Sequence, residues 1–169
     1  MKRGEPWMER VKHPILPLYN QDSKVLVLGS FPSVKSREAM FFYHHPQNRF
    51  WKVISGVFEE ALPVTIPEKR ALLLRNHIAV WDVIQSCEIT GSSDSSIRNV
   101  VVNDLSGLLA EAQIRQIIAN GSTSYRLYMK YIFPQTGRDI LKLPSTSPAN
   151  AACTYEKLLE AWSVIRIHT

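Results

Sequence analysis

Residues 25–51, VLVLGSFPSVKSREAMFFYHHPQNRFW, decide the fold of this 169-residue chain. The first four residues are apolar, have the composition of a buried β-strand and stop at Gly29. A tight turn with Pro32 follows, and the segment after it is rich in aromatic residues and histidines. Because open α/β sheets bind their ligands at the carboxyl ends of the strands, this turn marks a candidate site.

Strand-like and helix-like segments alternate along the rest of the chain. Short apolar runs predict strands, and apolar residues spaced three and four positions apart predict helices. Their alternation indicates βαβ units. We therefore expect an α/β fold, namely a three-layer α/β/α sandwich with a central four-stranded, mainly parallel sheet. The strands are expected at residues 24–28, 78–83, 114–119 and 139–143, and the helices at 48–58, 67–75, 105–109, 122–133 and 151–165.

Two segments depart from this alternation. Residues 1–22 contain three prolines among scattered apolar residues, which indicates an extended arm packed on the domain rather than a helix. Residues 85–96 are rich in serine and are expected to form a polar loop. The remaining length suits one domain, so we expect an N-terminal arm over residues 1–22 and a single domain over residues 23–169.

Composition narrows the class of protein. The chain is 45% hydrophobic and 21% charged, as is usual for a globular protein, and it has no apolar run of the roughly 18 residues that a membrane span needs. Cys87 and Cys153 lie far apart and lack metal-ligand spacing, which disfavours zinc and iron–sulfur sites. We expect no metal, no cofactor, no membrane contact, a monomer and a cytoplasmic location. The net charge of +5 favours a polyanionic partner but does not identify one.

Two blocks of sequence carry the functional interpretation. The first is GSFPS at residues 29–33 with YHHPQNRFW at residues 43–51, and the second is LPSTSPAN at residues 143–150. Together they resemble the uracil-DNA glycosylase superfamily, and most closely its hypoxanthine (deoxyinosine) DNA glycosylase branch, which is close to the mismatch-specific uracil glycosylases. The resemblance covers the chain from about residue 23 onward. It implies a base excision repair enzyme that acts on damaged DNA, associated with the nucleoid if the source is bacterial or archaeal.

The resemblance implies that the first block and the end of the second strand hold the flipped base. Tyr43 stands where similar enzymes place an aromatic ring that stacks on the base, although it can also be a core aromatic. Asp82 stands where related enzymes read the base edge, although it can also cap the following loop. A carboxylate can accept the N1–H of hypoxanthine and equally the N–H of uracil. The expected base-binding residues are Gly29, Ser30, Phe31, Pro32, Tyr43 and Asp82.

Asn48 is the expected catalytic residue. In the commonest uracil glycosylases the position of Phe31 holds an Asp or Asn that positions the attacking water, whereas the hypoxanthine branch resembles this chain in lacking it. An amide can donate and accept hydrogen bonds but is no general base near neutral pH, so Asn48 would orient water or the leaving base. Asn48 can equally cap the helix that begins there. Leu143 replaces the histidine that stabilises departing uracil in uracil-specific enzymes, which disfavours a fast uracil enzyme.

The second block resembles the loop that related enzymes press into the minor groove. Its two prolines reduce the entropy lost on docking, and its serines can bond to phosphate oxygens. A plain connection between a strand and a helix is the alternative. The expected DNA-binding residues are Ser33, Ser145, Ser147, Pro148, Ala149 and Asn150.

Two further functions stay open at this point. The same enzyme class can prefer uracil, xanthine or mismatched thymine. A non-catalytic module of the same fold can bind DNA or a nucleotide in the crevice, with Phe31 marking the loss of the catalytic group. Release of a base from damaged DNA separates the enzymes from the module.

Overall fold

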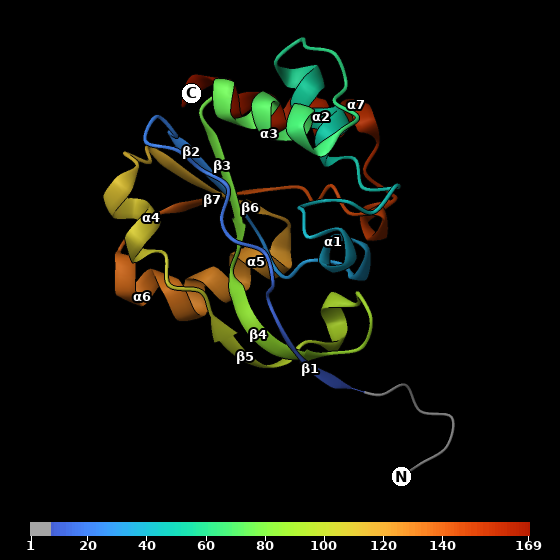
Figure 1. Ribbon diagram of the computed structural model, residues 1–169, viewed down its shortest axis with the longest axis vertical. Helices are drawn as coiled ribbons and strands as arrows, with labels where there is room; N and C mark the ends of the chain where they lie inside the picture. Colours follow the sequence, from blue (N-terminus) through green and yellow to red (C-terminus); the bar gives the residue numbers. More distant parts are fainter. Residues whose placement is uncertain (1–7) are drawn as a thin grey trace.

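Two β-sheets and the helices packed on them form the structure, a computed structural model that describes residues 8–169 (Figure 1). Residues 1–7 of the expected arm lie outside the described residues. The strands are β1 (Glu9–Lys12), β2 (Val25–Gly29), β3 (Ile78–Asp82), β4 (Ile84–Ile89), β5 (Arg98–Val102), β6 (Gln116–Asn120) and β7 (Ile140–Leu143). The helices are α1 (Val34–Ala39), α2 (Phe50–Val57), α3 (Ile66–Arg75), α4 (Ser106–Glu111), α5 (Ser122–Leu127), α6 (Phe133–Thr136) and α7 (Tyr155–Trp162).

The parallel sheet has the strand order β3-β2-β6-β7 and carries helices on both faces (Figure 1). Every residue of β2 is buried, as is typical of a parallel strand covered on both sides. Val25 and Val27 pack with α2, α3 and α7, whereas Leu26 and Leu28 pack with α4, α5 and the second sheet. The predicted three-layer α/β/α sandwich around a four-stranded parallel sheet is confirmed.

A second, antiparallel sheet with the order β1-β4-β5 was not predicted from the sequence. The prediction of a polar loop from residue 85 was wrong for β4, which pairs with β1 on one side and β5 on the other. Cys87 and Ile89 point into the core. Between them and the start of the strand, Ser86 is buried and accepts a hydrogen bond of 2.9 Å from Arg10 Nη2. A buried polar residue whose hydrogen bond is made in this way interrupts the apolar pattern by which a strand is predicted from sequence.

Local capping moves several helix boundaries from their predicted positions. Helix α1 was not predicted and begins after Ser33, whose hydroxyl accepts from Ser36 N. The last helix was expected from residue 151 but starts after Thr154, which caps Lys157 N at 3.2 Å. The helix expected over residues 122–133 continues through a π-helical turn at Tyr128–Ile132 to α6. It ends at Gly137, whose φ of +63° suits a glycine.

The N-terminal segment runs along β3, the edge strand of the parallel sheet. Leu18 exchanges backbone hydrogen bonds of 3.0 and 2.9 Å with Val80. Ile15 is buried, and its carbonyl oxygen accepts from Trp81 Nε1 at 3.1 Å. The segment thus covers an otherwise open sheet edge and brings His13 to the carboxyl end of β3.

Candidate active site

A pocket of about 1040 Å³ opens at the carboxyl ends of the four parallel strands. The last residue of each strand lines it: Gly29, Asp82, Asn120 and Leu143. The strand registers place Gly29 beside Asp82 and Asn120 beside Leu143. The volume lies at the upper end of the roughly 300–1,000 Å³ that ligand pockets occupy. The pocket can therefore accept a nucleobase together with its sugar.

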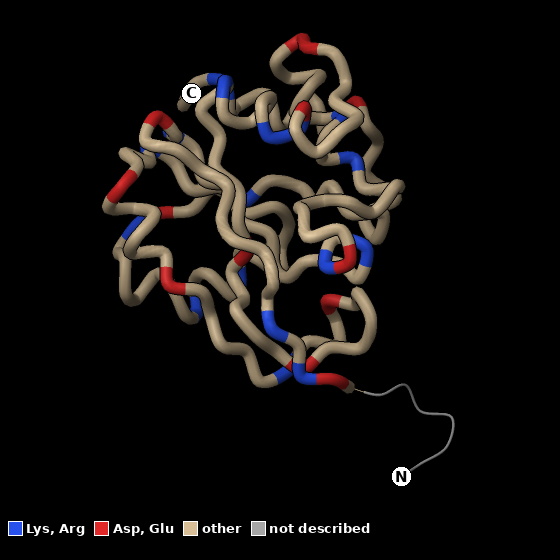
Figure 2. The backbone as a smooth tube through the Cα atoms, viewed as in Figure 1, with Lys and Arg blue, Asp and Glu red and all other residues tan. Residues whose placement is uncertain are grey.

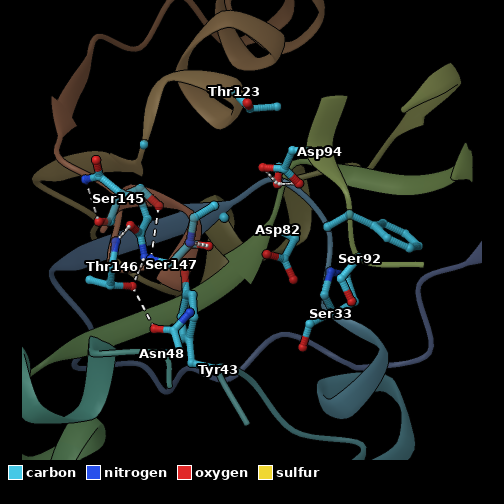
Figure 3. Close-up of a pocket in the computed structure, with 18 of the residues that line it drawn as sticks. Ser33, Tyr43, Asn48, Asp82, Ser92, Asp94, Thr123, Ser145, Thr146 and Ser147 are labelled. Atoms are coloured by element: carbon cyan, nitrogen blue, oxygen red, sulfur yellow. Dashed lines mark hydrogen bonds between the residues drawn. The ribbon is translucent and has the colours of Figure 1, made fainter. Parts of the chain in front are cut away.

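Every residue predicted for the site lines this one pocket. They come from the turn after β2, the His-Pro segment, the end of β3 and the loop before α7. Figure 3 shows Asn48, Ser145 and Thr146 on one side and Asp94 on the other, with Asp82 between them. The predicted residues are Gly29, Ser30, Phe31, Pro32, Ser33, Tyr43, Asn48, Asp82, Ser145, Ser147, Pro148, Ala149 and Asn150. The two sequence blocks converge on one cavity, and the roles of these residues stay predictions.

The side chain of Asn48 is held by its oxygen atom. Asn48 Oδ1 accepts from Phe50 N and from Thr146 Oγ1, each at 2.9 Å. Thr146 is fully buried and in turn accepts from Asn120 Nδ2 at 3.0 Å (Figure 3). Both acceptor positions of Asn48 Oδ1 are occupied, so the group left for a ligand is the Nδ2 amine, a donor. Asn48 thus holds the main chain at the first residue of α2, whose N-cap is Arg49, and keeps the hydrogens of its amide NH2 group for a ligand.

Tyr43 is fixed in an uncommon backbone conformation. Its φ is +50°, which costs energy for a bulky residue and is found where the surroundings impose it. Trp51 Nε1 donates to its carbonyl oxygen at 3.0 Å, and its ring stacks on Phe50 with centroids 4.0 Å apart. One face of the ring is thus covered by Phe50, and the residue lines the pocket. Burial raises the pKa of Tyr43 well above its ordinary value, and the charge of Asp82 adds to this rise.

Asp82 places a buried carboxylate at the floor of the pocket. The residue is 4% exposed, and its Oδ2 lies 2.7 Å from His13 Nε2. A Cβ on Gly29 would collide with Asp82 Oδ1 and come within 3.2 Å of Tyr43 Oη. Oδ1 therefore approaches the main chain at a point that only glycine leaves open. The alternative role, a cap for the following loop, is taken instead by Asn103, whose Nδ2 donates to the carbonyl oxygens of Asp82 and Ile84.

Phe31 packs near this carboxylate and places an apolar ring, not a hydrogen-bonding group, at its position. Its side chain is 8% exposed and belongs to the core beneath β4. The ring meets His13 edge-on, with centroids 5.9 Å apart, and Arg37 lies over it at 5.4 Å. An aromatic ring here shields the contact between His13 and Asp82 from water.

The loop before α7 is tied together by its own hydrogen bonds. Ser145 Oγ accepts from Ser147 N at 3.1 Å, and Ser147 Oγ accepts from Ala149 N at 3.2 Å. Asn150 Nδ2 donates to Ser145 O at 3.0 Å. Both serine hydroxyls act as acceptors in the loop and keep their hydrogens for other partners. Ser33 differs, because its hydroxyl hydrogen is donated to Ser36 Oγ within the cap of α1.

Asp94 is a pocket residue that the sequence did not single out. It follows β4 and faces the site across from Asn48 (Figure 3). Ser30 Oγ donates to both of its carboxylate oxygens, at 2.9 and 3.0 Å. Desolvation raises the pKa of Asp94 above the ordinary value of a carboxyl group, against the hydrogen bond from Ser30, and the negative charge of Asp82 raises it further.

We expect the substitution Asp94→Asn to stabilise the protein only slightly at neutral pH, because Asp94 is exposed and solvent and Arg126 offset most of the effect. A raised pKa in the folded state means that the native protein binds the proton more tightly than the unfolded chain, so ionisation of Asp94 opposes folding above that pKa. The gain in the free energy of unfolding over wild type should be largest near pH 7 and vanish at pH values where the wild-type carboxyl is protonated. Denaturant unfolding at a series of pH values measures it.

Asp104→Asn is the control with the opposite sign. Ser106 N donates to Asp104 Oδ1 at 2.9 Å, and this hydrogen bond lowers the pKa of Asp104. The substitution should therefore lower the stability at neutral pH, with the loss disappearing in acid. If both substitutions changed the free energy of unfolding in the same direction at neutral pH, the raised pKa of Asp94 would be contradicted.

Of the two histidines of the first block, His45 lines the pocket and His44 does not. His45 Nδ1 accepts from Gln47 N at 3.1 Å, which is a role in the turn. His44 Nδ1 is buried, and the described residues offer it no hydrogen-bond partner. Over residues 8–169, no three His, Cys, Asp or Glu side chains lie close enough together to hold a metal ion. In the same residues, no helix has the length and apolar character needed to cross a bilayer.

Lysine and arginine residues are dispersed along the backbone of the described chain rather than gathered in one segment (Figure 2). Arg126 and Lys142 are the ones that line the pocket. A second pocket of about 430 Å³ adjoins it through Arg126 and includes Arg98 and Lys130. Its lining contains no acidic residue, so a basic surface continues from the rim of the main pocket.

Comparison with known proteins gives a consistent set of relatives. A family model described as the uracil DNA glycosylase superfamily matches residues 16–166. A hypoxanthine DNA glycosylase from Methanosarcina acetivorans is 30% identical over 92% of this chain and 99% of its own length. One from Methanosarcina barkeri is 29% identical over 64% of this chain and 70% of its own. The solution NMR structure of a candidate uracil DNA glycosylase from M. acetivorans, 29% identical, has a TM-score of 0.79 and covers 92% of this chain and 97% of that one.

Proposed function

Since this chain belongs to the uracil DNA glycosylase superfamily, we propose that it hydrolyses the N-glycosidic bond of deaminated bases in DNA and prefers hypoxanthine. The family and the enzyme class predicted from the two sequence blocks are confirmed by the family match and by the named relatives. The preference for hypoxanthine is the proposal. It is supported by the names of the relatives and by the groups that face the pocket.

The observation that carries the proposal is the placement of Asp82 Oδ1 beside Tyr43 in the pocket. A flipped base stacked on Tyr43 presents its edge to this oxygen. Hypoxanthine and uracil offer an N–H there, which a carboxylate accepts. Adenine offers a lone pair instead, and its unpaired acceptor would cost about 1–3 kcal/mol. The site therefore selects deaminated bases against adenine.

Asn48 suits the second requirement, which is stabilisation of the departing base. In hydrolysis the bond from the sugar C1′ to the base nitrogen breaks, water oxygen bonds to C1′, and the base leaves with the electron pair and then takes the proton released from the water. Negative charge builds up on the base as the bond breaks, and a fixed donor stabilises it. The amine of Asn48 is such a donor, because the oxygen of the amide is already bound to Phe50 and Thr146.

The loop before α7 and the basic rim suit a DNA backbone. The hydroxyls of Ser145 and Ser147 keep hydrogens that phosphate oxygens can accept. Arg126 connects the main pocket to the smaller basic pocket, so a strand that enters the site meets positive charge beside it. We propose that DNA lies across this rim while the lesion turns into the pocket.

Release of bases from defined DNA duplexes tests the function. Duplexes with a single inosine, uracil, xanthine or mismatched thymine are incubated with the protein, and abasic sites are cleaved with alkali. We expect cleavage at inosine first and no cleavage of undamaged duplex. Faster release of uracil or thymine would contradict the preference for hypoxanthine. Binding to these duplexes without release of any base would contradict the enzyme and favour a binding module.

A further inference from the structure

His13 reaches the base-reading carboxylate from the N-terminal segment, outside both sequence blocks. Its Nε2 lies 2.7 Å from Asp82 Oδ2, and the two side chains are 2% and 6% exposed. His13 follows β1 directly, and Figure 1 shows this blue segment crossing β4 and β3. The residue does not line the pocket, so any effect on a base must pass through Asp82.

The second ring nitrogen of His13 fixes which atom carries the proton. Ile15 N donates to His13 Nδ1 at 3.2 Å, so Nδ1 is the acceptor of the ring. The proton of a neutral imidazole then sits on Nε2 and is donated to Asp82 Oδ2. The main chain at Ile15 is itself held, because its carbonyl oxygen accepts from Trp81 Nε1. The direction of the hydrogen bond from His13 to Asp82 is thus set by the backbone.

Aromatic rings enclose this contact. Phe31, Trp81 and Phe42 surround the imidazole, with ring centroids 5.9, 6.2 and 6.4 Å away. A hydrogen bond in such an apolar enclosure is electrostatically stronger than one in water, and a partner left alone there is costly. Asp82 Oδ2 therefore depends on His13 for its hydrogen bond.

We propose that His13 is a positioning residue for base recognition: its Nε2–H holds Asp82 Oδ2 and so presents Oδ1 as the acceptor for a base that carries an N–H beside a carbonyl. This inference rests on the proposed glycosylase function and assigns the N-terminal segment a part in it. Because Asp82 Oδ2 accepts the hydrogen bond from His13, rotation of the carboxylate would leave the buried Nε2–H of His13 without a partner. The oxygen facing the base is then always an acceptor.

A matched pair of variants separates the hydrogen bond from the packing of the ring. Gln and Met have similar length and flexibility, but only Gln carries an N–H that can reach the carboxylate. We expect His13→Met to lower kcat for hypoxanthine release about tenfold with little change in KM, and His13→Gln to retain most of kcat. The rates are measured under single-turnover and steady-state conditions on one inosine duplex, after thermal unfolding has shown both variants to be folded.

The controls distinguish the role of His13 from the proposed glycosylase activity. Wild type that releases no base overturns the proposed function. If wild type releases hypoxanthine while both variants match it, or lose activity equally, the role of His13 alone is overturned. Tyr19→Phe removes a hydrogen bond of 2.8 Å to Glu111 from the same segment, far from the carboxylate, and should leave the rate unchanged.

A measurement on the wild-type protein covers the case in which neither variant folds. Long-range proton–nitrogen correlation spectra of the imidazole rings distinguish the two neutral tautomers. We expect one buried histidine with the proton on Nε2 and an unprotonated Nδ1. A His13 ring that carries its proton on Nδ1 would overturn the proposal, because Nε2 could then not donate to Asp82.

Discussion

Replacing Asn48 with Asp should lower the rate of hypoxanthine release by about 100- to 1000-fold, the loss that follows removal of one fixed donor from a developing negative charge. The substitution keeps an oxygen where Asn48 Oδ1 accepts from Phe50 N and Thr146 Oγ1. It exchanges only the Nδ2 amine for a second oxygen, which repels the departing base. Single-turnover release from an inosine duplex measures the change.

Asn48→Ala should reduce the rate to a similar extent and in addition destabilise the protein. It removes both hydrogen bonds to the amide oxygen as well as the amide NH2 group, and each lost hydrogen bond typically costs about 1 kcal/mol. Comparison of the two variants therefore separates catalysis from stability. Only Asn48→Ala should shift the thermal unfolding midpoint clearly downward.

The neighbouring amide provides a control for the added negative charge. Gln47 is exposed and does not line the pocket, so Gln47→Glu introduces the same charge one residue away. We expect Gln47→Glu to release hypoxanthine at a rate within about threefold of wild type, because an exposed charge is screened by salt. A turnover unchanged in Asn48→Asp, or reduced equally in both variants, would remove the amine of Asn48 from the mechanism.

The parallel sheet was predictable because its strands are buried on both faces and read as short apolar runs. Residues 24–28 and 78–83 gave strands within a residue of β2 and β3. The antiparallel sheet was not predictable from the sequence. Strand β4 carries Ser86 and Glu88 where the alternating pattern of a strand requires apolar residues, and β1 lies in a segment that contains three prolines. Pairing between segments some 75 positions apart leaves no local trace in either of them.

The residues of the site likewise divide into those that the sequence pattern predicts and those that only the tertiary structure brings there. Asp82 was found because it lies near the end of a predicted strand, at the position where the resemblance places the side chain that reads the base edge. Asn120 follows another predicted strand directly, ends β6 and holds Thr146. Asn120 could therefore have been predicted. His13 and Asp94 could not, since His13 contacts Asp82 and Asp94 lines the pocket from segments next to strands of the second sheet, which the sequence did not indicate. Their positions follow from tertiary structure alone.

Replacing Asp82 with Asn should reverse the polarity of the group that meets the base. His13 Nε2–H requires an acceptor, so the new amide oxygen must take the place of Oδ2. Ile15 N prevents the ring from moving its proton to the other nitrogen. The amine of the new Asn then replaces Oδ1 and faces the pocket as a donor. An N–H of the base would meet another N–H.

We therefore expect Asp82→Asn to reduce the rate of hypoxanthine release by roughly 10- to 100-fold, which corresponds to one unpaired buried group at about 1–3 kcal/mol. Release of uracil should fall for the same reason, because its edge carries the same N–H. Discrimination against adenine should weaken, since its lone pair now meets a donor. The measurement is single-turnover release from duplexes that differ only in the target base.

Affinity for DNA distinguishes reading of the base edge from a general defect. Asp82 is buried below the rim, so its replacement should leave the dissociation constant for an inosine duplex within about threefold, and the lost negative charge acts only toward tighter binding. A rate reduced by the same factor for hypoxanthine, uracil and adenine would contradict a role in base selection. A changed ratio among the bases at unchanged affinity would place the choice of substrate at Asp82 Oδ1, because this is the only atom of the side chain that the contact with His13 leaves free for the base.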